Sequence, residues 1–162
     1  ISSVSLIYFT TNLPKLGTAR VTDNVEYKNK LLSKTWFIYI VSYILMLLLL
    51  FVVGIPIIEY IKPNVMLENS LLLFVALYMF LEANQSLFVS YISTSNKLPY
   101  VFPYLISAAS GVVIAIILLE YTDLGIWGIV FAHFVVQLCY NNWKWPYYVF
   151  KESKMNMVSI FK

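Results

Sequence analysis

Long apolar stretches separated by short polar segments dominate the sequence. Four such stretches follow one another, at about residues 36–60, 68–95, 98–120 and 124–148. About 20 apolar residues in an α-helix span the hydrocarbon core of a bilayer, so each stretch is long enough to cross it. The strand-length segments of alternating polarity that are typical of a membrane β-barrel are absent from the sequence. The pattern therefore predicts an all-α integral membrane fold with four transmembrane helices.

The segments between these stretches predict how the helices are arranged. The connections "EYIKPNVMLE", "STSNKLP" and "EYTDLG" are short, which favours consecutive antiparallel helices. With that alternation, every basic residue except Lys62 falls on one side: Lys15, Arg20, Lys28, Lys30, Lys34, Lys97, Lys144, Lys151, Lys154 and Lys162. The positive-inside rule then predicts that both ends of the chain face the cytoplasm.

The flanking segments indicate a part of a larger membrane domain. Residues 1–14 are interpreted as the end of a preceding membrane helix that closes near Pro14, and a surface helix or a disordered tail is the alternative. Residues 15–35 form a basic cytoplasmic segment, with an amphipathic helix that leads into the first span. The four-helix region covers residues 36–148, and residues 149–162 form a cytoplasmic tail. On this interpretation, further N-terminal helices of the same protein are partners of this chain.

Composition supports a membrane protein. The chain is 60% hydrophobic and 12% charged, whereas soluble domains carry about a quarter charged residues. The single Cys139 excludes an internal disulfide, and no Cys/His cluster has the spacing of metal ligands. We therefore expect no metal and no cofactor, and membrane lipids rather than nucleic acid as partners.

The stretch "FLEANQSLF" places an ionisable group, Glu82, near the middle of the second span. An isolated carboxylate there costs about 2.5 kcal/mol even on insertion scales. Such a group must face a water-filled cavity, take a partner, or remain protonated as a buried structural carboxyl. The sequence leaves a functional and a structural interpretation open.

Other polar residues form stripes at helical spacing. Gln85 and Ser86 share a face of the second span with Glu82, and Asn84 points elsewhere. The fourth span carries a stripe of His133, Gln137, Asn141 and Lys144. His133 is either a partner of Glu82 or a satisfied core histidine. In the third span, Ser107 and Gly111 have the small-residue spacing that lets helices approach closely.

Four passages together resemble the C-terminal part of bacterial polysaccharide and O-antigen flippases of the multidrug/oligosaccharidyl-lipid/polysaccharide exporter superfamily. "NLPKLGTARVTDNVEYKNKLLSK" resembles the loop and amphipathic helix between the eighth and ninth spans of that family. "LEANQSLFVSYISTSNKLPYV" resembles the tenth span and the turn after it. "LLEYTDLGIWGIVFAHFVVQL" resembles the turn between the eleventh and twelfth spans, and "QLCYNNWKWPYYVF" resembles the end of the twelfth.

The resemblance implies the C-terminal portion of a twelve-helix transporter, not an enzyme, in the bacterial inner membrane. Such a transporter flips an undecaprenyl-pyrophosphate-linked oligosaccharide between leaflets by alternating access, for polysaccharide and O-antigen export. Cavity candidates are then Glu82, Gln85, Ser86, His133 and Gln137. The uncharged or nearly uncharged stretches within the four spans, the last of which ends at Trp143, contain no Arg or Lys to meet the pyrophosphate, so Arg20 in the basic loop becomes the lipid-phosphate candidate. The alternatives are a small four-helix carrier or scaffold subunit and, with less support, a membrane enzyme acting on lipid-linked sugars.

Overall fold

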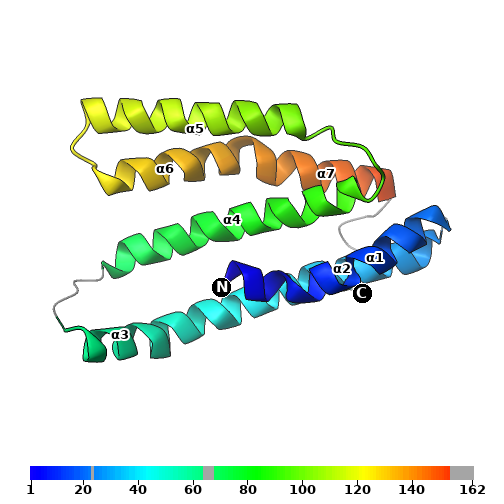
Figure 1. The fold of residues 1–162 in the computed structure, drawn as a ribbon, viewed down its shortest axis with the longest axis horizontal. Coiled ribbons are helices and arrows are strands. Elements are labelled where there is room, and N and C mark those ends of the chain that lie inside the picture. The colour runs from blue at the N-terminus through cyan, green and yellow to red at the C-terminus, as the bar shows by residue number, and fades with distance from the viewer. Residues whose placement is uncertain (23, 64–67, 154–162) are drawn as a thin grey trace.

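The structure, a computed structural model, describes residues 1–22, 24–63 and 68–153 (Figure 1). Throughout these ranges the regular structure is helical and no strand is present. Two short π-helical segments connect helices end to end: η1 (Leu50–Gly54) and η2 (Gln137–Asn141). The α-helices are α1 (Ser2–Val21), α2 (Val25–Leu49), α3 (Ile55–Ile61), α4 (Asn69–Ser93), α5 (Val101–Tyr121), α6 (Ile126–Val136) and α7 (Asn142–Ser153). The predicted all-α fold is confirmed.

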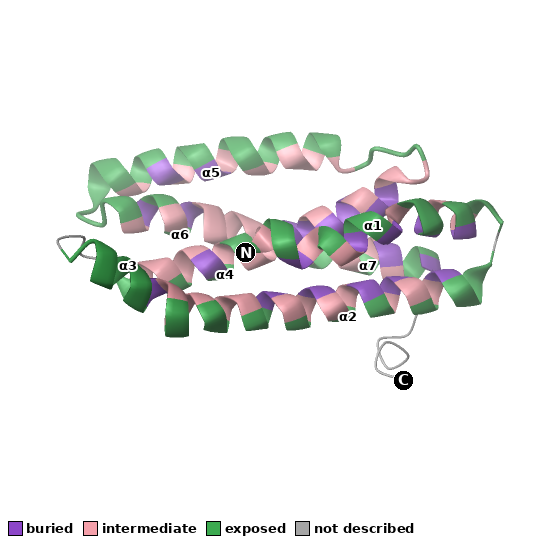
Figure 2. Ribbon diagram, turned by 60° about the horizontal axis from the view of Figure 1, so that its bottom comes forward, coloured by how far each residue is buried: buried purple, intermediate pink, exposed green. Residues whose placement is uncertain are grey.

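Three helices in the described part are long and apolar enough to cross a membrane: Val25–Ile61, Asn69–Ser93 and Val101–Tyr121. They correspond to the first three of the four predicted spans. The first helix begins at Val25, before the predicted start of its span at residue 36. Their outward side chains are largely apolar and exposed, as Figure 2 illustrates along α2 and α5. A surface of this kind suits lipid or further protein rather than water. By their length and composition, these three helices suggest a membrane protein.

The fourth predicted span, 124–148, has a different form. Its residues make the continuous but composite helix α6–η2–α7, which is not among the three apolar spans. Polar side chains are the reason, because Gln137, Asn141 and Asn142 fall in its middle. A fourth membrane crossing therefore stays a prediction.

Helix α1 extends further than the sequence indicated. The prediction that this helix ends near Pro14 is wrong, because α1 continues through Pro14 to Val21. A proline inside a helix removes one backbone donor, and packing can outweigh that loss. Leu16 and Ala19, which follow the proline, are buried where α1 packs on α2 and α4. The cytoplasmic tail predicted for residues 149–162 begins as the last turn of α7, and residues 154–162 lie outside the described ranges.

Helix α4 occupies the centre of the bundle. It packs against α1 and α2 on one side and against α6, η2 and α7 on the other, while α5 packs on α6 (Figure 1). Two tyrosines secure the first side, since the Tyr39 hydroxyl donates to Phe80 O at 2.7 Å and the Tyr43 hydroxyl donates to Ala76 O at 2.7 Å. Consecutive long helices run antiparallel, as the short links predicted.

Basic residues concentrate at one end of the bundle. The end formed by the close of α1, the start of α2 and the ends of α4 and α7 carries Arg20, Lys28, Lys30, Lys97 and Lys151; we call it the basic end. The opposite end, where α3 finishes and α5 turns into α6, carries the acidic residues Glu59, Glu68, Glu120 and Asp123 together with Lys62.

Candidate functional site: a polar cavity around Glu82

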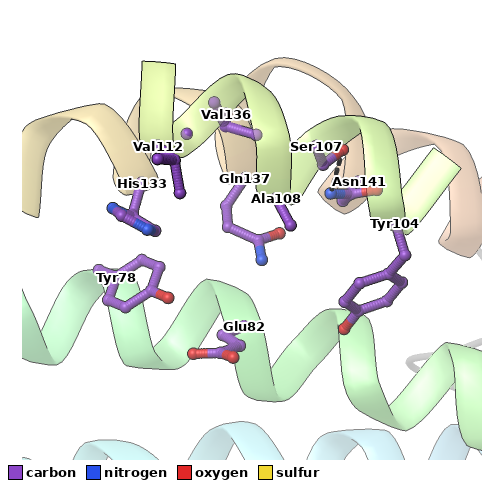
Figure 3. Close-up of a pocket in the computed structure, with 11 residues that line it drawn as sticks. Tyr78, Glu82, Tyr104, Ser107, Ala108, Val112, His133, Val136, Gln137 and Asn141 are labelled. Atoms are coloured by element: carbon purple, nitrogen blue, oxygen red, sulfur yellow. Dashed lines mark hydrogen bonds between the residues drawn. The ribbon is translucent and has the colours of Figure 1, made fainter. Parts of the chain in front are cut away.

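A cavity of about 200 Å³ lies between α4, α5 and the α6–η2 helix (Figure 3). Helix α4 forms one wall and α5 the opposite wall. Its polar lining consists of Tyr78 and Glu82 from α4, Tyr104 and Ser107 from α5, His133 from α6, and Gln137 and Asn141 from η2. Polar residues from three separate segments of the chain therefore converge on one space.

Glu82 is the only carboxylate that lines this cavity. It sits near the middle of α4, and its carboxylate has no ion-pair partner within the described ranges. The hydroxyl of Tyr78, one turn earlier on the same helix, points toward it (Figure 3). Because several polar side chains share the cavity with Glu82, the structure gives this carboxyl partly polar surroundings of the kind that a midspan position requires.

His133 shares the cavity with Glu82. Its Nδ1 lies 2.9 Å from Ile129 O, and a carbonyl oxygen only accepts, so Nδ1 carries the hydrogen of this bond. That arrangement leaves Nε2 as the free ring nitrogen on the cavity side, next to Gly111. The Tyr78 ring packs edge-on to the His133 ring with centroids 6.0 Å apart. Tyr78 thus lies between the two titratable groups, and a direct Glu82–His133 pair stays a prediction.

The π-helical turn η2 shapes the third wall. Gln137 begins this turn and extends into the cavity toward Glu82, and its Oε1 is buried without a hydrogen-bond partner (Figure 3). Asn141 ends the turn, donating to Ser107 Oγ at 3.1 Å and accepting from the Trp145 indole at 3.2 Å. Single π-turns inside α-helices occur frequently at functional sites.

Gln85 and Ser86, the other two cavity candidates, do not line the space around Glu82. Gln85 is completely buried inside the bundle, and both polar atoms of its amide lack a partner. Ser86 is half-buried. The stripe predicted from the sequence therefore divides, with Glu82 at the cavity and Gln85 in the packed interior.

Arg20 lies away from the cavity, at the basic end. Its guanidinium pairs with Glu152 of α7 and donates to Tyr91 O at 3.2 Å and to Thr94 Oγ1 at 3.3 Å. It also lies over the Tyr91 ring, 5.1 Å from the centroid. These contacts connect α1, α4 and α7, so the structure gives Arg20 a connecting role, and its role toward a lipid phosphate stays a prediction.

A series of side-chain hydrogen bonds, which the sequence did not indicate, crosses the bundle beside the cavity. The Trp36 indole donates to Asn84 Oδ1 at 2.9 Å, and the Asn84 amide donates to Asn142 Oδ1 at 2.9 Å. Asn142 in turn donates to the backbone oxygen of Gln137 at 3.2 Å. This hydrogen-bond series joins α2 and α4 to the turn that carries Gln137. The only hint of this hydrogen-bond series in the sequence was that Asn84 faces away from the stripe that contains Glu82.

The chemistry of the lining limits what this cavity can accommodate. Glu82 and Gln137 Oε1 offer acceptors, the hydroxyls of Tyr78 and Tyr104 can donate, and among the described residues neither Lys nor Arg lines the space. A phosphate here would meet a carboxylate with no cation to offset it. The cavity therefore suits a proton, a cation or a neutral polar group.

Comparison with known proteins finds no matching family, no matching curated protein and no matching solved structure.

Gly111 allows α5 to approach the His133 ring, and its replacement gives a direct test of this packing. A Cβ at position 111 would lie 3.6 Å from the ring, an ordinary contact, so we expect Gly111→Ala to fold normally. Gly111→Leu would drive a large side chain into the ring and separate the helices, destabilising the protein by about 2 kcal/mol. Thermal unfolding in detergent measures both variants. Equal stability of the two would show that residue 111 does not face α6.

Proposed function

We propose that this chain is part of a membrane transporter that flips a lipid-linked oligosaccharide across the bacterial inner membrane by alternating access. The lipid carrier is undecaprenyl pyrophosphate, and the translocated oligosaccharide is used for polysaccharide or O-antigen export. The four sequence stretches provide four crossings, with α6–η2–α7 as the fourth, and other helices of the same transporter complete the translocation path.

The observation that carries the proposal is the polar cavity around Glu82. A midspan carboxyl facing a polar cavity is typical of transport pathways and of sites that couple transport to an ion. Titration or ion pairing of such a carboxyl changes the relative free energies of two conformations when the group is more stable in one of them. The resemblance of residues 81–101 and 118–138 to flippase segments is the reason for proposing this class of transporter.

The charge distribution supports the proposed orientation. Basic residues gather at the end that holds Arg20 and Lys97, whereas Lys62 lies at the end that holds Glu120. The basic end then faces the cytoplasm by the positive-inside rule. In this orientation the pyrophosphate, for which the Glu82 cavity offers no cation, is bound elsewhere in the complete transporter.

Complementation tests the proposal. The complete reading frame that contains this chain is expressed in a bacterial strain that lacks its polysaccharide flippase but makes the lipid-linked oligosaccharide. We expect surface polysaccharide to return, measured by immunoblot of whole-cell extracts. A fully inserted protein that restores none, across several glycan types, would count against the flippase assignment.

A further inference from the structure

The outer face of α7 carries two adjoining hollows that share Lys144 and Tyr147. One hollow, of about 540 Å³, is bordered mainly by apolar and aromatic side chains such as Trp36 and Phe150. The other, of about 450 Å³, lies toward the basic end and is bordered by both Lys144 and Lys151. Together they form a groove, the α7 groove, with a long apolar part and a cationic end.

Three polar side chains that border the apolar part, those of Trp36, Asn84 and Asn142, already have hydrogen-bond partners. Trp36 donates to Asn84 and Asn84 donates to Asn142, each at 2.9 Å, while Asn142 donates to a backbone oxygen. Since these groups hydrogen-bond to one another, they require no partner from an occupant. An alkyl chain can therefore lie against these three side chains without leaving their donors unpaired.

The two lysines form the cationic end. They are seven residues apart on one helix, so they share a face and are separated by about 10 Å of rise. Both are exposed, and long lysine side chains can converge on one anion while their stems cover apolar surface. Glu152 also borders this end, but its carboxylate is paired with Arg20. The charge left to meet an occupant is positive.

Exposed aromatic residues favour a position of the groove at the depth of lipid headgroups. Trp143 and Tyr147 are 67% and 65% exposed and belong to the last turns before the basic end. Tryptophan and tyrosine concentrate where the hydrocarbon core meets the headgroups, because one part of each ring system is apolar and another is polar.

We propose that the α7 groove binds one anionic phospholipid of the surrounding membrane. One acyl chain lies along the apolar part between α2 and α7, and the phosphate lies between Lys144 and Lys151. The inference requires only that the helices sit in a bilayer with the C-terminal end of α7 at its surface, and it holds for any function of the Glu82 cavity.

Native mass spectrometry tests the proposal. The full chain is released from nanodiscs that contain equal amounts of phosphatidylglycerol and phosphatidylcholine, and the retained lipids are counted. We expect one phosphatidylglycerol to be retained in preference. Lys144→Gln with Lys151→Gln should weaken its binding about fivefold for each lysine. The matched control, Lys30→Gln with Lys97→Gln, removes the same charge from exposed residues outside the groove and should retain the lipid.

Three results would overturn the proposal. Equal loss of phosphatidylglycerol in both double variants would mean that net charge alone attracts the lipid. Competition by glycerol 3-phosphate as effective as that of the whole lipid would show that the apolar part is unused. Displacement of phosphatidylglycerol by undecaprenyl phosphate at equal concentration would identify a polyprenyl lipid, not a membrane phospholipid, as the occupant.

Discussion

If the proposed function holds, Glu82→Gln in the complete protein is expected to insert and fold normally and to reduce transport to background. Glutamine keeps the shape of the side chain and most of its hydrogen bonding but cannot titrate or carry charge. If the carboxyl switches the protein between its two conformations, the variant loses the differential stabilisation that drives the switch. The measurement is surface polysaccharide in the flippase-null strain, at expression equal to that of the unmodified protein.

Two further variants separate a functional carboxyl from a structural one. Glu82→Asp keeps the charge at a shorter reach and should retain part of the activity. Ser86→Ala changes a half-buried residue one turn away that does not line the cavity, and it should leave transport unchanged. Full complementation by Glu82→Gln at every external pH would mean that the carboxyl only supports packing.

Arg20→Ala is expected to loosen the basic end of the bundle. The guanidinium side chain is only 14% exposed, and it connects α1 to Glu152 on α7 and to the end of α4. Its removal leaves Glu152, which is 34% exposed, without its cation and leaves the Tyr91 carbonyl without this donor. Loss of charge-assisted hydrogen bonds of this kind costs about 2 kcal/mol. For a chain of this size we expect a fall in Tm of about 4–8 °C.

The control for Arg20 lies on the same helix. Lys15 is exposed, so Lys15→Ala removes one charge without breaking an interhelical contact and should change Tm little. Glu152→Gln combined with Arg20→Ala should cost less than the sum of the single changes, because residues in direct contact are not additive. Equal Tm values for Arg20→Ala and Lys15→Ala would contradict the connecting role of Arg20.

The helices of this fold could be predicted because long apolar runs interrupted by short polar links admit few other structures in a membrane. The end of α1 was the exception. The helix was expected to end near Pro14, but it continues because Leu16 and Ala19, beyond the proline, are buried in the bundle. Propensity at one residue describes the local chain, whereas burial depends on which helices pack together. The sequence held no signal for that packing.

The site could be predicted only in part. Glu82, His133 and Gln137 share one cavity, yet Gln85 from the same stripe as Glu82 is buried elsewhere, because residues three apart on a helix diverge by about 60°. Likewise, Lys144 was placed on the His133 stripe but borders the α7 groove. The reason is the π-turn η2, which precedes Lys144. The additional residue in a π-turn rotates the side chains after it by about 100° about the helix axis.

The contribution of α5 was also beyond the sequence. Tyr104 and Ser107 line the cavity from a helix whose residues otherwise gave only a packing signal. Rotation of a membrane helix about its axis depends on its neighbours, and here Asn141 fixes that rotation by donating to Ser107. Only the arrangement of three helices together defines the cavity.

Accessibility of Ala108 tests most directly whether the Glu82 cavity is an alternating-access pathway. Ala108 is exposed on α5 and lines the cavity, so a cysteine there samples its water. With the exposed Cys139 replaced by alanine, a membrane-impermeant maleimide is applied to intact cells and to inverted vesicles. Thr122→Cys and Lys97→Cys, at opposite ends of α5, are the references for the outer and inner faces. The account predicts that Ala108→Cys reacts from both sides, Thr122→Cys only in cells and Lys97→Cys only in inverted vesicles. Failure of Ala108→Cys to react from either side, with the references behaving as stated, would contradict it.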